Sequence, residues 1–278
     1  TPIFGGSGSL EAFRVTQGTI SVTGGGLDAT EANRIDLISK ATTVNAKIWA
    51  KEINSVTGTN EVKYNDLATT ALDATDDHVV ALDIGQLGGM YANKIKLVGT
   101  KKGLGVNNEG TIDVNQDIII NENGEINNAG TIKATDSISV ISDNKLNNTK
   151  EIDTKNLTIK TTQINNNPAG KIYGTDVTIE TDKLDNKGDG TNAPVLAARN
   201  NMNIAAKKIN NTEHGLIFSN NDLTITGKAD NGDNSNEKVE TINNNSATIE
   251  SLGNINILAK DINNTNEHFS YVLDPIES

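Results

Sequence analysis

A three-residue signature, an aliphatic residue followed by Asn-Asn or Asp-Asn, recurs eight times between residues 106 and 264. The first residues of successive copies lie 20, 20, 18, 20, 25, 33 and 20 positions apart. Self-similarity at a fixed period is typical of repeat architectures, in which each repeat is one structural unit that stacks on the next. The repeat therefore constrains the fold more than any other feature of the chain.

Pairs of apolar residues spaced by two occur at a constant phase within the repeats, and this spacing puts both side chains on one face of a β-strand. Short strands of this kind bury a core only by stacking on equivalent strands of the next repeat. The sequence therefore predicts an all-β protein, a right-handed parallel β-helix of about 20 residues per turn, and hence about 13–14 turns. The expected core residues are Ile118, Ile120, Ile138, Val140, Leu157, Ile159, Val177, Ile179, Leu223, Ile225, Ile255 and Ile257.

The last asparagine of each signature should stand at a corner of the β-helix, because asparagine tolerates the left-handed backbone conformation that sharp turns need. Stacked asparagines can hydrogen-bond to one another along the rod. We therefore expect a structural asparagine ladder formed by Asn108, Asn128, Asn148, Asn166, Asn186, Asn211, Asn244 and Asn264. Leucine-rich repeats share the period, but their L-x-x-L-x-L blocks are absent, as is the G-G-x-G-x-D motif of calcium-binding nonapeptides.

The chain divides into an irregular part, residues 1–105, and a regular part, residues 106–278. The irregular part keeps short β patterns, such as residues 14–22, 35–38, 46–50 and 94–98, which we expect to form earlier, less regular turns of the same β-helix. It also contains an excursion at about 60–80. Two repeats are longer than the others, and their extra residues are polar and rich in turn formers. We expect these segments, at about 185–194 and 227–240, to be loops that leave the wall at corners.

The composition excludes several partners. The net charge is −12, from 24 Lys and Arg against 36 Asp and Glu, and no basic cluster offers a face for phosphates. Nucleic acid is therefore not an expected partner. No apolar stretch is long enough to cross a bilayer, so no membrane insertion is expected, and the chain has no cysteine for disulfides or zinc–thiolate sites. A monomeric rod is the expected state.

No motif predicts a catalytic, cofactor or metal site, and we expect no enzyme activity. Asp76-Asp77-His78 is the single acidic–histidine cluster, and it is interpreted as a solvated loop; His214 is interpreted as a surface residue. Neither polar loop has the alternating oxygen ligands of an EF-hand. Trp49 is interpreted as a core or cap residue, with ligand stacking as the alternative. Because β-helices also host polysaccharide lyases and hydrolases, a polysaccharide-binding or polysaccharide-cleaving protein remains the alternative function.

A block in the first third of the chain carries a family resemblance. It reads Leu87-Gly88-Gly89-Met90-Tyr91-Ala92-Asn93-Lys94-Ile95, and it is followed by Gly103-Leu104-Gly105-Val106-Asn107-Asn108. This block resembles a hallmark of two-partner-secretion exoproteins, which include filamentous haemagglutinin-like adhesins and the toxin-delivery proteins of contact-dependent growth inhibition. The segments 26–29, 35–38 and 44–50 are similar to the same family, and the Asn-Asn copies resemble its haemagglutinin repeats.

The resemblance implies a stretch of shaft just after the N-terminal secretion domain, because Asn-Pro-Asn motifs of that domain are missing. It also implies export through an outer-membrane β-barrel partner and a location outside a Gram-negative cell, on its surface. A receptor on a target bacterial or host cell would be bound through regions outside this chain. The resemblance does not separate adhesion from toxin delivery.

Overall fold

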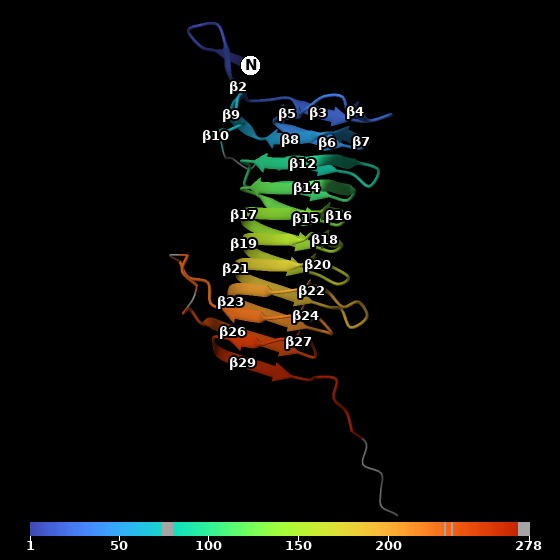
Figure 1. Ribbon diagram of the computed structural model, residues 1–278, viewed down its shortest axis with the longest axis vertical. Coiled ribbons are helices and arrows are strands. Elements are labelled where there is room, and N and C mark those ends of the chain that lie inside the picture. The colour runs from blue at the N-terminus through green and yellow to red at the C-terminus, as the bar shows by residue number, and fades with distance from the viewer. Residues whose placement is uncertain (74–79, 231, 235, 272–278) are drawn as a thin grey trace, which may run out of the picture.

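The computed structural model describes residues 1–73, 80–230, 232–234 and 236–271 (Figure 1). Within these ranges the chain is all-β, with no helix, and so with none that could span a membrane. The strands form a parallel β-solenoid of about 11 turns, here called rungs, with about 21 residues each. This confirms the predicted fold class. The rungs are fewer than the 13–14 expected, because the chain ends and loops lie outside the wall.

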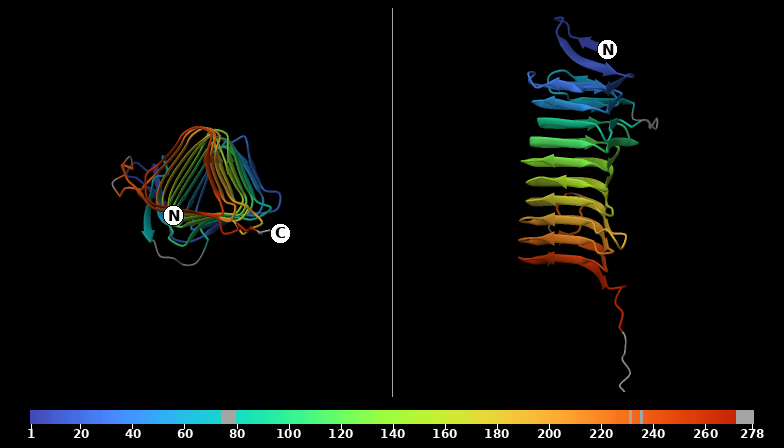
Figure 2. Two further views of the ribbon diagram at one scale, coloured as in Figure 1. Left: turned by 90° about the horizontal axis from the view of Figure 1, so that it is seen from below. Right: turned by 90° about the vertical axis from the view of Figure 1, so that its right-hand side faces the viewer.

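Each rung has three sides, and Figure 2 shows the rungs superposed as a three-sided outline when seen along the rod. We call the sides faces A, B and C, in the order in which the chain passes through them. Face A contains β3 (Thr19–Val22), β6 (Ala41–Val44), β11 (Leu82–Ile84), β13 (Leu104–Asn108), β15 (Glu125–Asn128), β26 (Val239–Asn245) and β29 (Ala259–Thr265). It also takes the second halves of β17 (Ser137–Asn148), β19 (Asn156–Asn166), β21 (Asp176–Lys187) and β23 (Met202–Thr212).

Faces B and C are built in the same way. Face B contains β4 (Leu27–Ala29), β7 (Lys47–Ala50), β16 (Thr131–Ala134), β18 (Glu151–Asp153), β20 (Lys171–Gly174), β22 (Val195–Ala198), β24 (Leu216–Ser219) and β27 (Thr248–Ser251), with the first parts of β12 (Gly89–Gly99) and β14 (Thr111–Glu122). Face C contains the remaining halves of β12, β14, β17, β19, β21 and β23, together with β5 (Ile35–Ser39), β8 (Glu52–Thr57), β25 (Leu223–Thr226) and β28 (Ile255–Ile257).

A separate antiparallel sheet lies at the N-terminal end of the rod. It is formed by β1 (Pro2–Phe4), β2 (Leu10–Val15), β9 (Thr59–Lys63) and β10 (Thr69–Asp73). The pattern at residues 14–22 was expected to be wall throughout, but Arg14 and Val15 pair with β9 in this sheet. The physical reason is that β9 leaves the wall after β8 and pairs with the N-terminal segment, which has no rung above it in the structure.

One continuous aliphatic core runs along the rod from Val22 to Ile242. Of the expected core residues, those from Ile118 to Ile225 are buried and point inward. Ile255 departs from the expectation: it is 47% exposed, and Ile257 is half-buried. Both lie in β28, the last strand of face C in the described chain, where no further rung stacks on them.

The corner between faces A and B brings successive rungs close together at glycines. A Cβ atom added to Gly130 would overlap the backbone oxygen of Gly110 in the rung before it. Two insertions widen corners of the rod: residues 188–194 at the A–B corner between β21 and β22, and residues 227–238 at the C–A corner between β25 and β26. They lie within the two segments expected to be loops, although the first begins three residues later because β21 continues to Lys187.

Candidate functional site

The eight expected ladder asparagines lie in one column on the inner side of face A. From Asn108 to Asn244, each Nδ2 atom donates a hydrogen bond to the Oδ1 atom of the asparagine in the next rung, at 2.7 to 2.9 Å. The column runs without a gap from Asn108 to Asn264. Its members from Asn108 to Asn244 are buried, whereas Asn264, in the last rung, is exposed.

From Asn108 to Asn244, the Nδ2 atom of each amide also donates to a backbone carbonyl oxygen. Asn128 donates to the carbonyl oxygen of Glu151 at 3.1 Å, and Asn211 donates to that of Thr248 at 2.8 Å. These carbonyls belong to the first residues of face B strands, so the amides bridge the A–B corner as well as stacking along the rod. A buried amide costs little free energy only when its donors and acceptor are satisfied, and here the repeat itself supplies the partners.

The ladder has a defined upper end. The residue paired with Asn108 in the preceding rung is Ile84, and the one before that is Val44. Because neither can donate, the Oδ1 atom of Asn108 is buried without a hydrogen-bond partner in the described structure. The inner column of face A therefore changes from aliphatic to amide between β11 and β13.

A second, outer ladder was missed by the sequence reasoning. It begins at Asp83, which precedes Ile84, and continues through the residue before each of the eight inner asparagines: Asn107, Asn127, Asn147, Asn165, Asp185, Asn210, Asn243 and Asn263. In its hydrogen bonds between rungs, the Nδ2 atoms donate toward the N-terminal end, opposite to the inner ladder. The two rows of amide dipoles therefore oppose each other. The sequence signal that could have identified the outer ladder is the middle residue of each signature, Asn or Asp, which repeats with the same period as the last asparagine.

The corner between faces C and A holds a column of hydroxyl side chains. Ser142 donates to the carbonyl oxygen of Gly124 at 2.7 Å, and Thr161 donates to that of Gln163 at 3.2 Å. Glu122 occupies the equivalent position in the rung before Ser142. Its side chain is buried, and neither carboxyl oxygen has a hydrogen-bond partner among the described residues.

Glycines make the space that Glu122 fills. A Cβ at Gly99 would overlap the Glu122 carboxyl group, and a Cβ at Gly105 would come within 2.8 Å of Oε2. Burial raises the pKa of Glu122 to about 8, so the carboxyl is mainly protonated at neutral pH. A glutamate at the phase of Ser142 and Thr161 is the sequence signal that could have identified this group.

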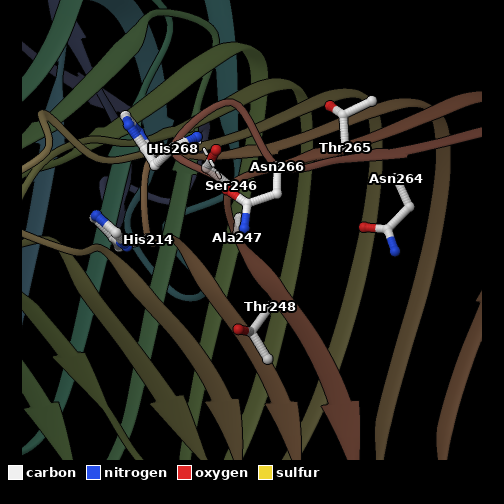
Figure 3. A pocket seen from close by; sticks show the side chains of 8 residues that line it. All are labelled: His214, Ser246, Ala247, Thr248, Asn264, Thr265, Asn266 and His268. Carbon is white, nitrogen blue, oxygen red and sulfur yellow. Dashed lines mark hydrogen bonds between the residues drawn. The ribbon is translucent and has the colours of Figure 1, made fainter. Parts of the chain in front are cut away.

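Figure 3 shows a cavity of about 490 Å³ at the A–B corner near the last rung. The rings of His214 and His268 stack there with centroids 5.7 Å apart, and His268 Nε2 lies 3.0 Å from Glu213 Oε2. The cavity is lined by His214, Ser246, Ala247, Thr248, Asn264, Thr265, Asn266 and His268. Asn264, the last inner-ladder asparagine of the described chain, is one of these residues.

Neither histidines nor loops assemble a metal site in the described ranges, which hold no group of three His, Cys, Asp or Glu side chains placed to bind an ion. Asp189 in the first loop accepts hydrogen bonds from the backbone of Thr191 and Asn192, and these bonds lower its pKa. The Asp189 carboxylate therefore binds backbone N–H groups of its own loop. The cluster Asp76-Asp77-His78 lies outside the described residues.

The outward side of face B carries the aromatic residues of the wall. Trp49 was expected in the core or at a cap, but it points outward, because its neighbours Ile48 and Ala50 take the inward positions. Its ring stacks on Tyr91 with centroids 6.2 Å apart. The same outward column continues through Asp113, Lys133, Asp153, Tyr173, Ala197, Phe218 and Glu250.

Comparisons with known proteins identify the N-terminal half. Residues 3–133 match the family described as the TPS secretion domain. The chain is 44% identical over 127 residues to the tRNA nuclease CdiA-2 of Burkholderia pseudomallei (strain 1026b) and 42% identical over 121 residues to the toxin CdiA of Yersinia pestis. These matches cover 45% and 42% of this chain, but 4% of each relative. No solved structure matches the chain.

The family match corrects one expectation. Residues 1–105 were expected to follow the secretion domain, yet the match to that domain begins at residue 3 and extends to residue 133. The expectation was wrong because it relied on one missing motif, whereas the match extends over the N-terminal antiparallel sheet and the first rungs. The matched region therefore runs past the start of the regular repeats and past the first two ladder asparagines, Asn108 and Asn128.

Proposed function

We propose, from the premise that the chain belongs to the two-partner-secretion exoproteins, that this segment is a rigid shaft that projects other regions of a large exoprotein from a cell surface. The observation that carries the proposal is the continuity of the rod. The core extends from Val22, inside the matched secretion domain, to Ile242, with no break between the domain and the repeats that follow. A joint that could bend would need such a break.

The mechanism of a shaft is mechanical. Bending a solenoid opens the spacing between rungs on one side, and this stretches the hydrogen bonds between parallel strands. In this rod the two asparagine ladders add side-chain bonds along face A. About 11 rungs at about 4.8 Å give a described wall of roughly 50 Å.

The partners follow from the same proposal. We expect export through an outer-membrane β-barrel protein, a final location outside a Gram-negative cell and on its surface, and a monomeric rod. Receptor binding on a bacterial or host cell would lie in other regions of the exoprotein. The relatives are named as a toxin and a tRNA nuclease, but the matched segment is 4% of their length. We place any such activity outside this segment, in either an adhesin or a toxin-delivery protein.

The arrangement of acidic groups supports a non-enzymatic role. A polysaccharide-cleaving β-helix needs free carboxyl groups on one face. On face B, Glu151 pairs with Lys133 at 3.0 Å, and Asp153 pairs with Arg199 at 2.9 Å. These carboxylates are engaged in ion pairs on the surface, so we do not propose cleavage.

The experiment that tests the shaft removes one whole rung outside the matched secretion domain. Deleting residues 149–166 joins Asn148 to Asn167, so that Asn148 takes the place of Asn166 in the ladder and the native turn at Asn167-Pro168 follows. The variant should fold with a thermal midpoint close to that of the parent. Co-expressed with its outer-membrane partner, it should reach the cell surface at the parental level.

The matched control deletes residues 149–157, which is half a rung. This change joins the end of a face A strand to a face C strand, so the inward and outward positions no longer stack, and folding should fail. If the whole-rung variant folds but is not displayed, the segment has a specific role beyond spacing. If both deletions are tolerated equally, the stacked-rung basis of the shaft is wrong.

A further inference from the structure

A gap between two aromatic side chains lies on the outward side of face B, over the strands labelled β20, β22 and β24 in Figure 1. Tyr173, Ala197 and Phe218 occupy the same column in three successive rungs. Because neighbouring strands are about 4.8 Å apart, the two aromatic residues are separated by about 9.6 Å. The methyl group of Ala197 leaves the space between them open, and a cavity of about 420 Å³ lies there.

The other aromatic pair of the column shows what the gap means. Trp49 and Tyr91 are in adjacent rungs, and their rings stack directly on each other with 21° between the planes. Nothing can enter between them. Tyr173 and Phe218 also point outward, but the rung of Ala197 lies between them. A ring of a ligand could therefore lie over Ala197, between the two aromatic side chains.

Polar side chains border the gap. The Arg199 guanidinium lies 5.8 Å from the centre of the Tyr173 ring and donates to Asp153 Oδ1 at 2.9 Å. Asn220 lines the same cavity. A second cavity of about 450 Å³ shares Arg199 and continues along the rod past Asp153 to Lys133. Together the two cavities form a groove parallel to the rod axis, aromatic at one end and polar at the other.

The charges of the groove compensate one another. Arg199 is paired with Asp153, and Lys133 is paired with Glu151. The hydrogen bond to Glu151, with the negative charges of Asp153 and Asp113, raises the pKa of Lys133, which therefore stays charged at neutral pH. An ionic ligand would have to break these pairs. The complementary ligand is uncharged, with hydroxyl groups that can both donate to and accept from the paired side chains.

We propose that this groove binds a neutral oligosaccharide, with one pyranose ring seated over Ala197 between Tyr173 and Phe218. A pyranose has a face of C–H groups, which suits the negative face of an aromatic ring, and an edge of hydroxyls, which suits Arg199, Asp153 and Asn220. The neighbouring rings of the sugar chain follow the groove toward Lys133. This inference does not depend on the shaft role.

A polypeptide fits the groove less well. The backbone groups of β20, β22 and β24 are used in the ladders to the rungs on either side, so a peptide strand cannot be added here. A cavity of about 420 Å³ lies in the usual range for small-ligand pockets. It is lined by six residues, whereas a stable protein interface has roughly 20–30 residues on each side.

The test measures binding of the 278-residue chain to cellohexaose, maltohexaose and chitohexaose by calorimetry and by saturation-transfer NMR. At least one of the three should bind. Phe218→Ala should weaken that binding at least tenfold, because one wall of the slot is lost. Ala197→Tyr should abolish it by filling the slot, while the outward, half-buried position leaves the thermal midpoint nearly unchanged. Ile119→Ala, an exposed aliphatic residue on face C, is the matched control and should bind as the parent does.

Three results would overturn the proposal. The first is no binding of any of the three sugars at concentrations up to 10 mM, a ceiling set about tenfold above a weak, roughly millimolar interaction. The second is binding that survives both Phe218→Ala and Ala197→Tyr, which would place the sugar elsewhere. The third is binding of N-acetyl-phenylalaninamide, but not of sugars, which would make the gap a pocket for a protein side chain.

Discussion

The rungs before residue 100 and the rungs after residue 104 have the same three-faced backbone but different inner columns on face A. In the first region the column consists of Val22, Val44 and Ile84; in the second it consists of asparagines from Asn108 onward. Both columns are stacked from rung to rung, and both are buried except at Asn264. The difference shows that a solenoid accepts either an apolar or a polar column, provided that successive residues are of the same kind.

The boundary between the two regions shows the cost of a mismatch. The Oδ1 atom of Asn108 has no partner because Ile84 stands above it, whereas each asparagine from Asn128 to Asn264 accepts a bond from the one before. A buried asparagine is therefore stabilised by hydrogen bonds to the same residue in the neighbouring rungs, and it loses this stabilisation where the neighbouring residue is of another kind. Glu122 lies close to the same boundary, and it too is a polar group without an equivalent neighbour to bond to.

The largest effect is expected from placing an asparagine in an apolar column of the regular region. Ile138 is buried, and its neighbours in the column are Ile118 and Leu157. Ile138→Asn should lower the free energy of unfolding by about 3–5 kcal/mol, because it loses an aliphatic side chain and leaves an amide unpaired. Ser139→Asn, on the outward side of the same strand, should cost under about 0.5 kcal/mol. Equal shifts in urea midpoint would contradict the inward–outward assignment.

The next effect concerns pH at the boundary. Burial holds the Glu122 pKa near 8, above the ordinary value of 4.5 that applies in the unfolded chain. The stabilising contribution of the bound proton is complete below pH 4.5. It is lost as pH rises from 4.5 to about 8, because the unfolded chain releases the proton first. Over this window the stability should fall by roughly 3–5 kcal/mol.

Urea unfolding of the parent and of Glu122→Gln between pH 5 and 9 measures this loss. The glutamine variant should lack the drop, since it does not titrate, while Glu125→Gln, which removes a partly exposed carboxylate paired with Lys145, should retain it. A parent stability that stays level across the window would show that Glu122 is not buried as a neutral acid.

Interrupting the ladder should cost more than moving its end. Asn148→Leu leaves a donor on Asn128 and an acceptor on Asn166 without partners, at an expected cost of roughly 2–4 kcal/mol. Ile84→Asn instead extends the ladder by one rung, because the new amide can donate to Asn108 Oδ1. Its loss of aliphatic burial is partly offset, so we expect about 1–2 kcal/mol. Equilibrium unfolding of both variants checks the order, and the reverse order would reject stabilisation by repetition.

The smallest effect is expected where the regular region departs from its period. Deleting residues 228–237 removes most of the loop between β25 and β26 but keeps Val239, which is buried in the core. The closure entropy of a loop changes slowly with its length, so the free energy of unfolding should change by no more than about 1 kcal/mol. Surface ion pairs of Lys207 and Lys228 contribute little. Loss of the cooperative thermal transition would show that the loop packs against the wall.

The sequence alone determined the repeat, the three short strands in each rung and the stacking of like residues. It could do so because stacked positions are equivalent: knowing one rung predicts what lies above and below it. For the same reason the inner asparagines, from Asn108 to Asn264, could be assigned to one column, and the outer ladder was available in the same signature.

Only the tertiary structure shows the contacts between residues that occupy different positions in the repeat. Three features show this: β2 pairs with β9, Trp49 points outward, and Glu122 is buried. Each depends on contacts between residues that are not equivalent in the repeat or that lie in its irregular part. The groove on face B depends on the register of Tyr173 and Phe218 across an insertion of the chain, and on Arg199 reaching Asp153, 46 residues away. Periodicity specifies which residues repeat, but only the folded rungs bring unlike residues into contact.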